Sequence, residues 1–81
     1  MSYSVSTVEK LPKLAVSMQE GTILEWFVQS GDTIERGQKI YSIESEKAVL
    51  EVESPFAGSI TLLADTGMTL KVGTPIAEIT T

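Results

Sequence analysis

The chain has 81 residues, with 6 basic and 11 acidic side chains and a formal net charge of −5 at pH 7. It contains no cysteine and no histidine, which excludes disulfides, thiolate nucleophiles and sulfur-bound metals and removes the commonest general base. An acidic chain without a basic cluster is a poor candidate for binding nucleic acid or an anionic membrane surface, so we predict neither partner. The length predicts a single domain, residues 1–81, with a core at about residues 5–80.

Short stretches rich in Ile, Val, Leu, Thr and aromatic residues alternate with glycines and prolines along the whole chain. Strands of this kind with closely spaced turn signals are typical of a β-sandwich or barrel, and we find no substantial stretch with helical spacing. We predict tight turns at Gly31-Asp32 and Gly67-Met68, each followed by a short strand. In chain order, the longer predicted strands are residues 7–10, 22–28, 39–43, 49–52, 59–63 and 75–80.

The two halves of the chain are similar when one is shifted against the other by 36 or 37 positions. The aligned pairs are Gly21 with Gly58, Ile23 with Ile60, Gly31 with Gly67, Thr33 with Thr69, Gly37 with Gly73, Ile40 with Ile76 and Ile43 with Ile79. Because glycines and apolar residues agree in register, we interpret this as a true repeat rather than a chance likeness of two β-meanders. Two such halves bury their apolar faces on each other about a pseudo-two-fold axis. We therefore predict an all-β fold, a flattened β-barrel or sandwich of two four-stranded antiparallel sheets.

The repeat also predicts what lies at the two ends of the molecule. The segment that joins the halves, residues 44–57, forms a hairpin at one end. The first and last strands, near residues 7–10 and 75–80, pair at the opposite end and bring the termini together.

Lys47 is the main functional candidate in the joining hairpin. The turn must fall within residues 44–48, which places Lys47 at or beside the tip, and it is the only cation among the ten residues 44–53. An exposed lysine keeps a pKa of about 10.4 and the neighbouring carboxylates tend to raise it, so Lys47 is a poor nucleophile by itself. Its projecting amine is better placed for another enzyme to acylate. A solvated turn lysine that balances the local acids is the simpler alternative.

The second arm of the hairpin alternates apolar and acidic residues. Leu50 and Val52 alternate with Glu51 and Glu53, which predicts one apolar face and one solvated face. The acidic side chains either meet a basic patch on a partner or are simply solvated. The aromatic residues that we assign to packing rather than to binding are Trp26, Phe27, Tyr41 and Phe56.

From Leu11 to Ile79 the chain resembles the lipoyl domains of 2-oxo acid dehydrogenase complexes, in the biotinyl/lipoyl carrier family, whose fold is a barrel-sandwich hybrid. The matching elements are Leu11-Pro12-Lys13-Leu14, Ser17-Met18-Gln19-Glu20-Gly21-Thr22-Ile23, Trp26, Gly31-Asp32, Gly37, Ile43-Glu44-Ser45-Glu46-Lys47-Ala48, Gly58 and Val72-Gly73-Thr74-Pro75-Ile76. The resemblance implies that Lys47 carries lipoate in amide linkage, with Glu46, Ala48 and Glu44 as flanking recognition residues. Glu46 stands where lipoyl domains usually have Asp. Biotin on Lys47 is the alternative, but biotin carriers usually flank their lysine with methionines, which are missing here.

The resemblance implies a carrier that shuttles acyl groups and reducing equivalents, not an enzyme, and we predict no catalytic residue and no metal ligand. The carrier is either free-standing or part of a dihydrolipoamide acyltransferase chain. Its implied partners are a lipoyl-protein ligase or transferase, a 2-oxo acid dehydrogenase, the acyltransferase core and dihydrolipoamide dehydrogenase. The 2-oxo acid stays open among pyruvate, 2-oxoglutarate, branched-chain acids and acetoin.

The resemblance further implies that a loop lies near Lys47 and helps to choose the dehydrogenase partner. This loop consists of Ser17, Met18, Gln19 and Glu20. An ordinary connection between two strands is the alternative. We expect the domain to be monomeric and cytoplasmic, or in the mitochondrial matrix of a eukaryote.

Overall fold

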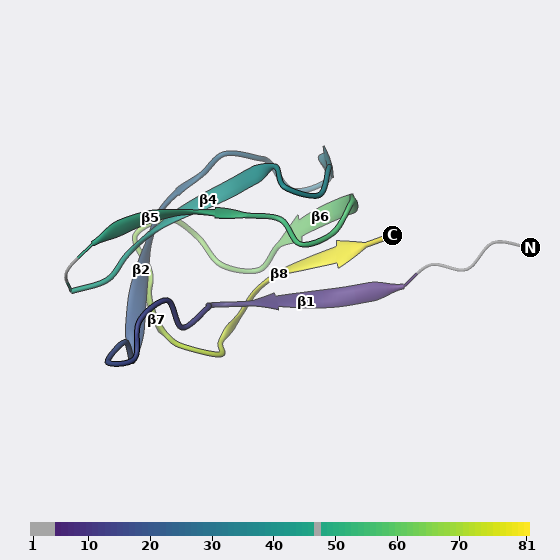
Figure 1. The fold of residues 1–81 in the computed structure, drawn as a ribbon. Helices are drawn as coiled ribbons and strands as arrows, with labels where there is room; N and C mark the ends of the chain where they lie inside the picture. The colour runs from purple at the N-terminus through teal and green to yellow at the C-terminus, as the bar shows by residue number, and fades with distance from the viewer. Residues whose placement is uncertain (1–4, 47) are drawn as a thin grey trace, which may run out of the picture.

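The computed structural model describes residues 5–46 and 48–81. These residues form strands joined by turns and no helix, as predicted (Figure 1). No membrane-spanning helix is therefore present in the described part of the chain. The strands are β1 (Ser6–Lys10), β2 (Glu20–Trp26), β3 (Thr33–Ile34), β4 (Lys39–Glu44), β5 (Val49–Glu53), β6 (Gly58–Leu62), β7 (Thr69–Lys71) and β8 (Pro75–Thr80).

The strands form two antiparallel sheets of four, which confirms the predicted fold class. One sheet has the order β1-β8-β6-β3 and the other has the order β5-β4-β2-β7. Each sheet therefore takes two strands from each half of the chain. The sheets are open, so the described strands form a flattened sandwich and not a closed hydrogen-bonded barrel.

The predicted two-fold repeat is visible in the topology and in the hydrogen bonds. If β1–β4 are exchanged with β5–β8, the order of one sheet becomes the order of the other. The Gly31 amide donates to the Ile60 carbonyl at 2.7 Å, and the equivalent Gly67 amide donates to the Ile23 carbonyl at 2.7 Å. Gly31 and Gly67 have φ of 96° and 84°, a conformation in which glycine avoids the steric penalty of a side chain. The two predicted turns are therefore equivalent.

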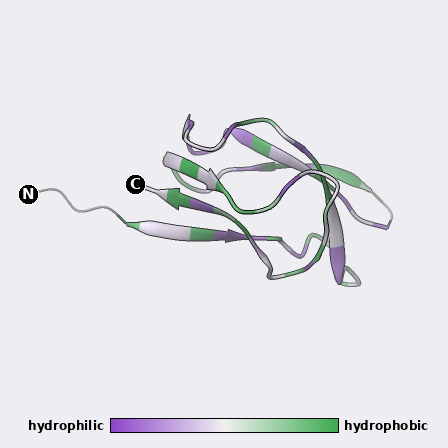
Figure 2. Cartoon of the chain, turned by 180° about the vertical axis from the view of Figure 1, so that it is seen from behind, coloured by the Kyte–Doolittle hydropathy of each residue, from purple (hydrophilic) through white to green (hydrophobic). Residues whose placement is uncertain are grey.

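The core lies between the two sheets and is rich in isoleucine. Strands alternate hydrophobic and hydrophilic positions along their length (Figure 2), so each sheet turns one apolar face inward. The largest fully buried side chains are Tyr41, Leu11, Ile23, Ile34, Ile40, Ile43, Ile60, Ile76 and Ile79. Several of these isoleucines are the aligned pairs of the repeat, so the same positions fill the core from both halves.

The prediction that all four aromatic residues pack is correct for two of them. Tyr41 is fully buried, and Trp26 packs against the core with its ring centroid 5.1 Å from that of Tyr41. The indole of Trp26 donates to the Ala64 carbonyl at 3.0 Å. The prediction is wrong for Phe27 and Phe56, which are 41% and 42% exposed. Both residues lie in connections just outside the strands, where alternation between an inner and an outer face no longer applies.

The two ends of the molecule, which we call its poles, are closed by equivalent hydrogen bonds. At one pole, Ser45 follows β4, and its amide donates to the Ala48 carbonyl at 2.8 Å. At the other, Thr81 follows β8, and its amide donates to the Val5 carbonyl at 2.9 Å. Figure 1 shows the β4–β5 turn at one end of the molecule and the C-terminus, beside the start of β1, at the other. Pairing of β1 with β8 at the end opposite the hairpin confirms that prediction.

Candidate functional site

The candidate site is the turn between β4 and β5. The last pair of the ladder joins Glu44 to Val49, and the bond from the Ser45 amide to the Ala48 carbonyl closes the turn directly beyond it. The Ser45 hydroxyl donates to the same carbonyl at 3.3 Å. This arrangement confirms that the turn falls within residues 44–48.

Lys47 itself lies outside the described residues, so its assignment as an attachment site stays a prediction. Its described neighbours Glu46 and Ala48 are both exposed, and so is Glu44 at the end of β4. The three flanking residues predicted from the resemblance are therefore accessible to a partner.

The predicted separation of an apolar and a solvated face on β5 is only partly found. Val52 is half-buried against the core, but Leu50 on the same face is 41% exposed. The reason is that β5 is an edge strand with β4 as its one neighbour in the sheet. On the other face, the Glu51 carboxylate accepts a hydrogen bond from the Lys39 ammonium at 2.9 Å. This bond and the charge of Glu51 raise the pKa of Lys39.

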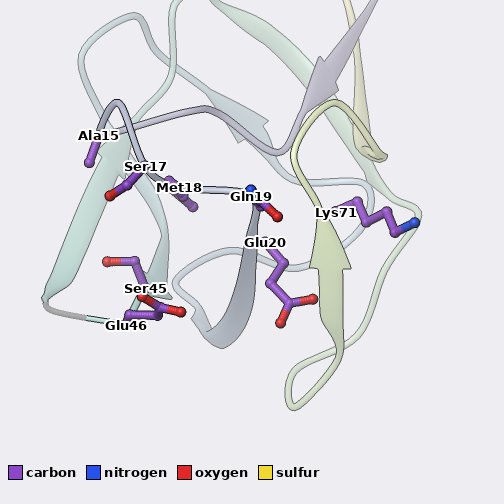
Figure 3. A pocket seen from close by; sticks show the side chains of 8 residues that line it. All are labelled: Ala15, Ser17, Met18, Gln19, Glu20, Ser45, Glu46 and Lys71. Carbon is purple, nitrogen blue, oxygen red and sulfur yellow. The ribbon is translucent and has the colours of Figure 1, made fainter.

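A hollow of about 500 Å³ lies between the hairpin turn and the loop that precedes β2 (Figure 3). The residues that line it are Ala15, Ser17, Met18, Gln19, Glu20, Ser45, Glu46 and Lys71. The four predicted loop residues thus line one hollow with Glu46, whereas their position relative to Lys47 lies outside the described residues and their role in choosing a partner stays a prediction. Glu44 and Ala48 are not among the lining residues.

Met18 anchors this loop to the core. Its side chain is 6% exposed, its amide donates to the Ala15 carbonyl at 3.0 Å, and its sulfur lies 3.3 Å from the amide of Leu14. A Cβ atom added to Gly21 would lie 3.0 Å from Met18 Cε and 2.7 Å from Ile43 Cδ1. Met18 therefore acts mainly through packing, and Gly21 leaves the space in which it packs.

The wall of the hollow is partly polar and partly apolar, and it carries charges of both signs. Glu20 and Glu46 supply carboxylates, and Lys71 lies directly across from Glu20 in the ladder between β2 and β7. In Figure 3 the Lys71 side chain extends away from the side where Ser45 and Glu46 lie. Within residues 5–46 and 48–81, no three acidic side chains group as ligands for a metal ion. The arrangement is suited to recognition of a polar partner.

Sequence reasoning missed three of the lining residues, which are Ala15, Ser45 and Lys71. No local pattern links Lys71 to the hairpin. The link is the register of Glu20 with Lys71, which depends on β7 lying beside β2 in the sheet. Ser45 could have been included from its place in the predicted turn.

Comparison with known proteins places this geometry in a family. The biotin–lipoyl family model, with the description "Biotin-requiring enzyme", matches residues 7–79. The chain belongs to this family. The match includes both the hairpin and the loop beside it, so the resemblance seen in the sequence is confirmed.

Relatives of this biotin–lipoyl domain are components of 2-oxo acid dehydrogenase complexes. The chain is 45% identical over 71 residues to the dihydrolipoyllysine-residue succinyltransferase component of the 2-oxoglutarate dehydrogenase complex of Staphylococcus saprophyticus. It is 35% and 34% identical to the dihydrolipoyllysine-residue acetyltransferase components of the pyruvate dehydrogenase complexes of Staphylococcus epidermidis and Staphylococcus aureus.

Each of these matches covers 86% of this chain but only 16% or 17% of the relative. The chain thus spans about a sixth of the length of the relatives that it matches. All three are named for a dihydrolipoyllysine residue, which favours a lipoyl domain over a biotin domain.

Proposed function

We propose that Lys47 carries lipoate in amide linkage and that this domain is the mobile acyl carrier of a 2-oxo acid dehydrogenase complex. The observation that supports this most directly is the closed turn of residues 45–48, whose described members present Glu46 and Ala48 to solvent at the pole away from the paired strands β1 and β8. Membership of the biotin–lipoyl family supports the same reading.

The described residues around the turn fit such a group. Glu46, Ala48 and Val49 are exposed, and Ala48 has only a methyl side chain, so these neighbours leave access to the turn from solvent. The chain has no cysteine, and bound lipoate supplies the disulfide that this sequence lacks, which can be reduced and can accept an acyl group. The role left to the protein is to present this group.

The residues of the hairpin have two tasks in this proposal. The two hydrogen bonds from Ser45 to the Ala48 carbonyl hold these two residues on either side of the turn together. Exposed Glu44 and Glu46 surround the turn with negative charge. Amide formation on Lys47 removes one cation, so the formal net charge of −5 becomes −5 − 1 = −6.

The position of the chain ends supports a tethered carrier. β1 and β8 pair from Ser6 with Thr80 to Lys10 with Pro75, so segments attached at either end begin at the pole opposite the hairpin. A tether there leaves the hairpin free to reach several active sites, and tethering raises the local concentration of the carrier at each of them. The proposed partners are a lipoyl-protein ligase, a 2-oxo acid dehydrogenase, an acyltransferase core and dihydrolipoamide dehydrogenase.

Intact-mass measurement after co-expression with a lipoyl-protein ligase tests the proposal. The parent chain should gain the mass of one lipoyl group, Lys47→Ala should gain none, and Lys10→Ala, at an exposed lysine on β1, should be modified like the parent. A parent chain that gains no mass would contradict the proposal. A streptavidin blot of the same samples reports the alternative, because only biotin gives a signal.

A further inference from the structure

β1 is an edge strand that leaves apolar side chains and one side of its backbone open. Among the described residues β8 is its one neighbour in the sheet (Figure 1). Val8 within the strand is 42% exposed, and Val5 directly before it is 59% exposed. The edge strands β3 and β7 have only two and three residues, and such short strands offer little backbone to a partner. The five residues of β1 offer more.

Glu9 lies on the face of β1 that the fold turns inward. Thr7 and Glu9 are half-buried. Ser6, Val8 and Lys10 alternate with them and are exposed. Because consecutive residues of a strand point to opposite faces, the acidic side chain of Glu9 points toward the core and the apolar side chain of Val8 points toward solvent. This is the reverse of the usual preference of these residue types.

The other half of the molecule shows that the fold does not require this charge. Glu9 pairs with Ala77 in one sheet, and Val52 pairs with Tyr41 in the other. Ala77 follows Tyr41 by 36 positions, which is the shift of the repeat at this place, so Glu9 and Val52 occupy equivalent places. Val52 packs against the core. An apolar residue is therefore the side chain that this place accommodates best, and Glu9 departs from it.

The Glu9 carboxyl group is partly removed from water. Burial raises its pKa above the ordinary value. Tyr41 is the titratable residue that faces it from the opposite sheet, and burial together with the charge of Glu9 raises the pKa of Tyr41. On β8, Ala77 lies opposite Glu9, while the neighbouring Glu78 lies opposite Val8 on the outer face.

No described cation neutralises Glu9. Within residues 5–46 and 48–81, the one ion pair joins Lys39 to Glu51 on the other sheet. Burial of an unpaired charge is strongly unfavourable, so the carboxylate depends on its remaining access to water. At an edge strand this access lies past the open side of the backbone.

We propose that the outer edge of β1 is a surface for antiparallel pairing with a second copy of this chain, and that the Glu9 carboxylate keeps this surface closed until it is protonated. A strand added at this edge would cover the route by which the carboxylate reaches water. Proteins use inward-pointing charges on edge strands to prevent such pairing. Protonation of Glu9, or its replacement by a neutral side chain, removes the obstacle.

The residues of β1 suit pairing with a second copy. In an antiparallel pair centred on Val8, the two Val8 side chains lie opposite each other, Lys10 lies opposite Ser6, and Glu9 lies opposite Thr7. Residues that lie opposite each other in such a pair interact on the same face, so the centre is apolar and like charges do not meet. The arrangement is two-fold symmetric, as in most dimers of identical chains. Because the paired strands are short, we expect association only at high protein concentration.

The pH dependence follows from the same carboxyl group. Its pKa is already raised in the single domain, and pairing would desolvate it further, so pairing takes up protons. Association should therefore strengthen as the pH falls through the pKa of Glu9 and weaken above it. Acidification also lowers the net negative charge of the whole chain, which weakens repulsion at every surface. A neutral variant at one place is therefore the sharper test.

Two variants at neutral pH isolate the effect of Glu9. Glu9→Gln and Glu53→Gln remove the same charge, the first from a half-buried place on β1 and the second from an exposed place on the edge strand β5. Sedimentation equilibrium of the full chain measures the association constant of the dimer. We expect Glu9→Gln to raise this constant about tenfold or more, since no carboxylate has to be desolvated, and Glu53→Gln to leave it near the parent value. Equal constants for Glu9→Gln and the parent would overturn the proposal.

A second pair of variants locates the surface. Val8→Lys, added to Glu9→Gln, sets two lysines opposite each other and should abolish the gain. Val49→Lys, at an exposed apolar residue of β5, should retain it. In Glu9→Gln, amide hydrogen exchange in residues 6–10 should slow as the protein concentration rises, whereas exchange in residues 49–53 should not. A gain that survives Val8→Lys, or slowing at β5 alone, would assign the association to another surface and refute the proposal.

A pH series on the parent and Glu9→Gln tests the control by protonation. The association constant of the parent should rise as the pH falls, and that of Glu9→Gln should change less. An equal pH dependence of the two proteins would contradict control by Glu9. None of these measurements involves lipoylation, so the proposed function stands or fails separately.

Discussion

Substitution of Gly21 by alanine tests how the loop and the hairpin are held together. Gly21 has no positive φ, so the backbone tolerates alanine and the effect comes from contacts alone. The added Cβ would lie 2.7 Å from Ile43 Cδ1, 2.9 Å from Ile43 Cγ1 and 3.0 Å from Met18 Cε. Carbon atoms pack at about 3.5–4.0 Å, so these neighbours must move by roughly 1 Å.

The expected loss of stability follows from the burial of these neighbours. Ile43 is 1% exposed and Met18 is 6% exposed, so neither can move into solvent without leaving the core. Overpacking of this kind costs about 1–3 kcal/mol. For a domain of this size each kcal/mol lowers Tm by roughly 4–8 °C, so we expect a clear decrease in thermal unfolding followed by circular dichroism.

A double-mutant cycle identifies the contact responsible. Ile43→Val removes Cδ1, the atom closest to the added Cβ, and costs about 0.5–1.5 kcal/mol by itself. Since the smaller side chain makes room for the methyl group, Gly21→Ala with Ile43→Val should be less destabilised than the sum of the two single variants by roughly 1 kcal/mol. Urea unfolding of the four proteins measures this difference. Additive losses would refute the contact as the cause.

Four smaller predictions concern polar side chains. The buried Tyr41 hydroxyl has no hydrogen-bond partner among residues 5–46 and 48–81, so Tyr41→Phe should keep or raise Tm at neutral pH. A decrease in Tm would contradict this reasoning. Burial raises the pKa of Tyr41, so ionisation is disfavoured in the folded state, and the parent should lose more stability above about pH 10 than Tyr41→Phe does. The hydrogen bond and the charge of Glu51 raise the pKa of Lys39. The stabilising effect of this ion pair is therefore present below the ordinary lysine pKa and is lost as the pH rises through the pKa of Lys39 in the folded state. Glu51→Gln should move the pKa of Lys39, measured by NMR titration, back toward its ordinary value, and an unchanged pKa would contradict the pair. Ser45→Ala removes an exposed hydroxyl donor at 3.3 Å from the Ala48 carbonyl. The free energy of unfolding, measured in urea, should fall by about 0.5 kcal/mol or less, and a fall of more than about 1 kcal/mol would contradict this prediction.

The strands and their symmetry were predictable because they depend on local patterns. β-branched residues bounded by glycines give the strands, and repetition of Ile23 at Ile60 and of Gly31 at Gly67 gives the two-fold relation. The structure places these residues in equivalent hydrogen bonds. The hairpin turn followed from the same reasoning, because the joining segment had to reverse the chain between two antiparallel strands.

The remaining features depend on contacts between distant segments. The exposure of Phe27 and Leu50 could not be predicted, since it is decided by whether a neighbouring strand or the opposite sheet covers each position. Lys71 joins the hollow through its register with Glu20, which no local pattern reveals. The assignment of Lys47 stays a prediction from the order of residues around it, because nothing in its residue type distinguishes it from other lysines.

The likeness of the two poles means that the backbone is almost a closed ring of two equal halves. Ser45 with Ala48 and Thr81 with Val5 make the same amide bond, and each pair adds the same hydroxyl bond, at 3.3 Å and 3.2 Å. A circular permutant that links residue 81 to residue 5 by the turn sequence Glu-Lys and opens the chain inside the present hairpin would exchange the two poles. The proposed attachment point and the point where we propose a tether would then change places while every strand kept its neighbours.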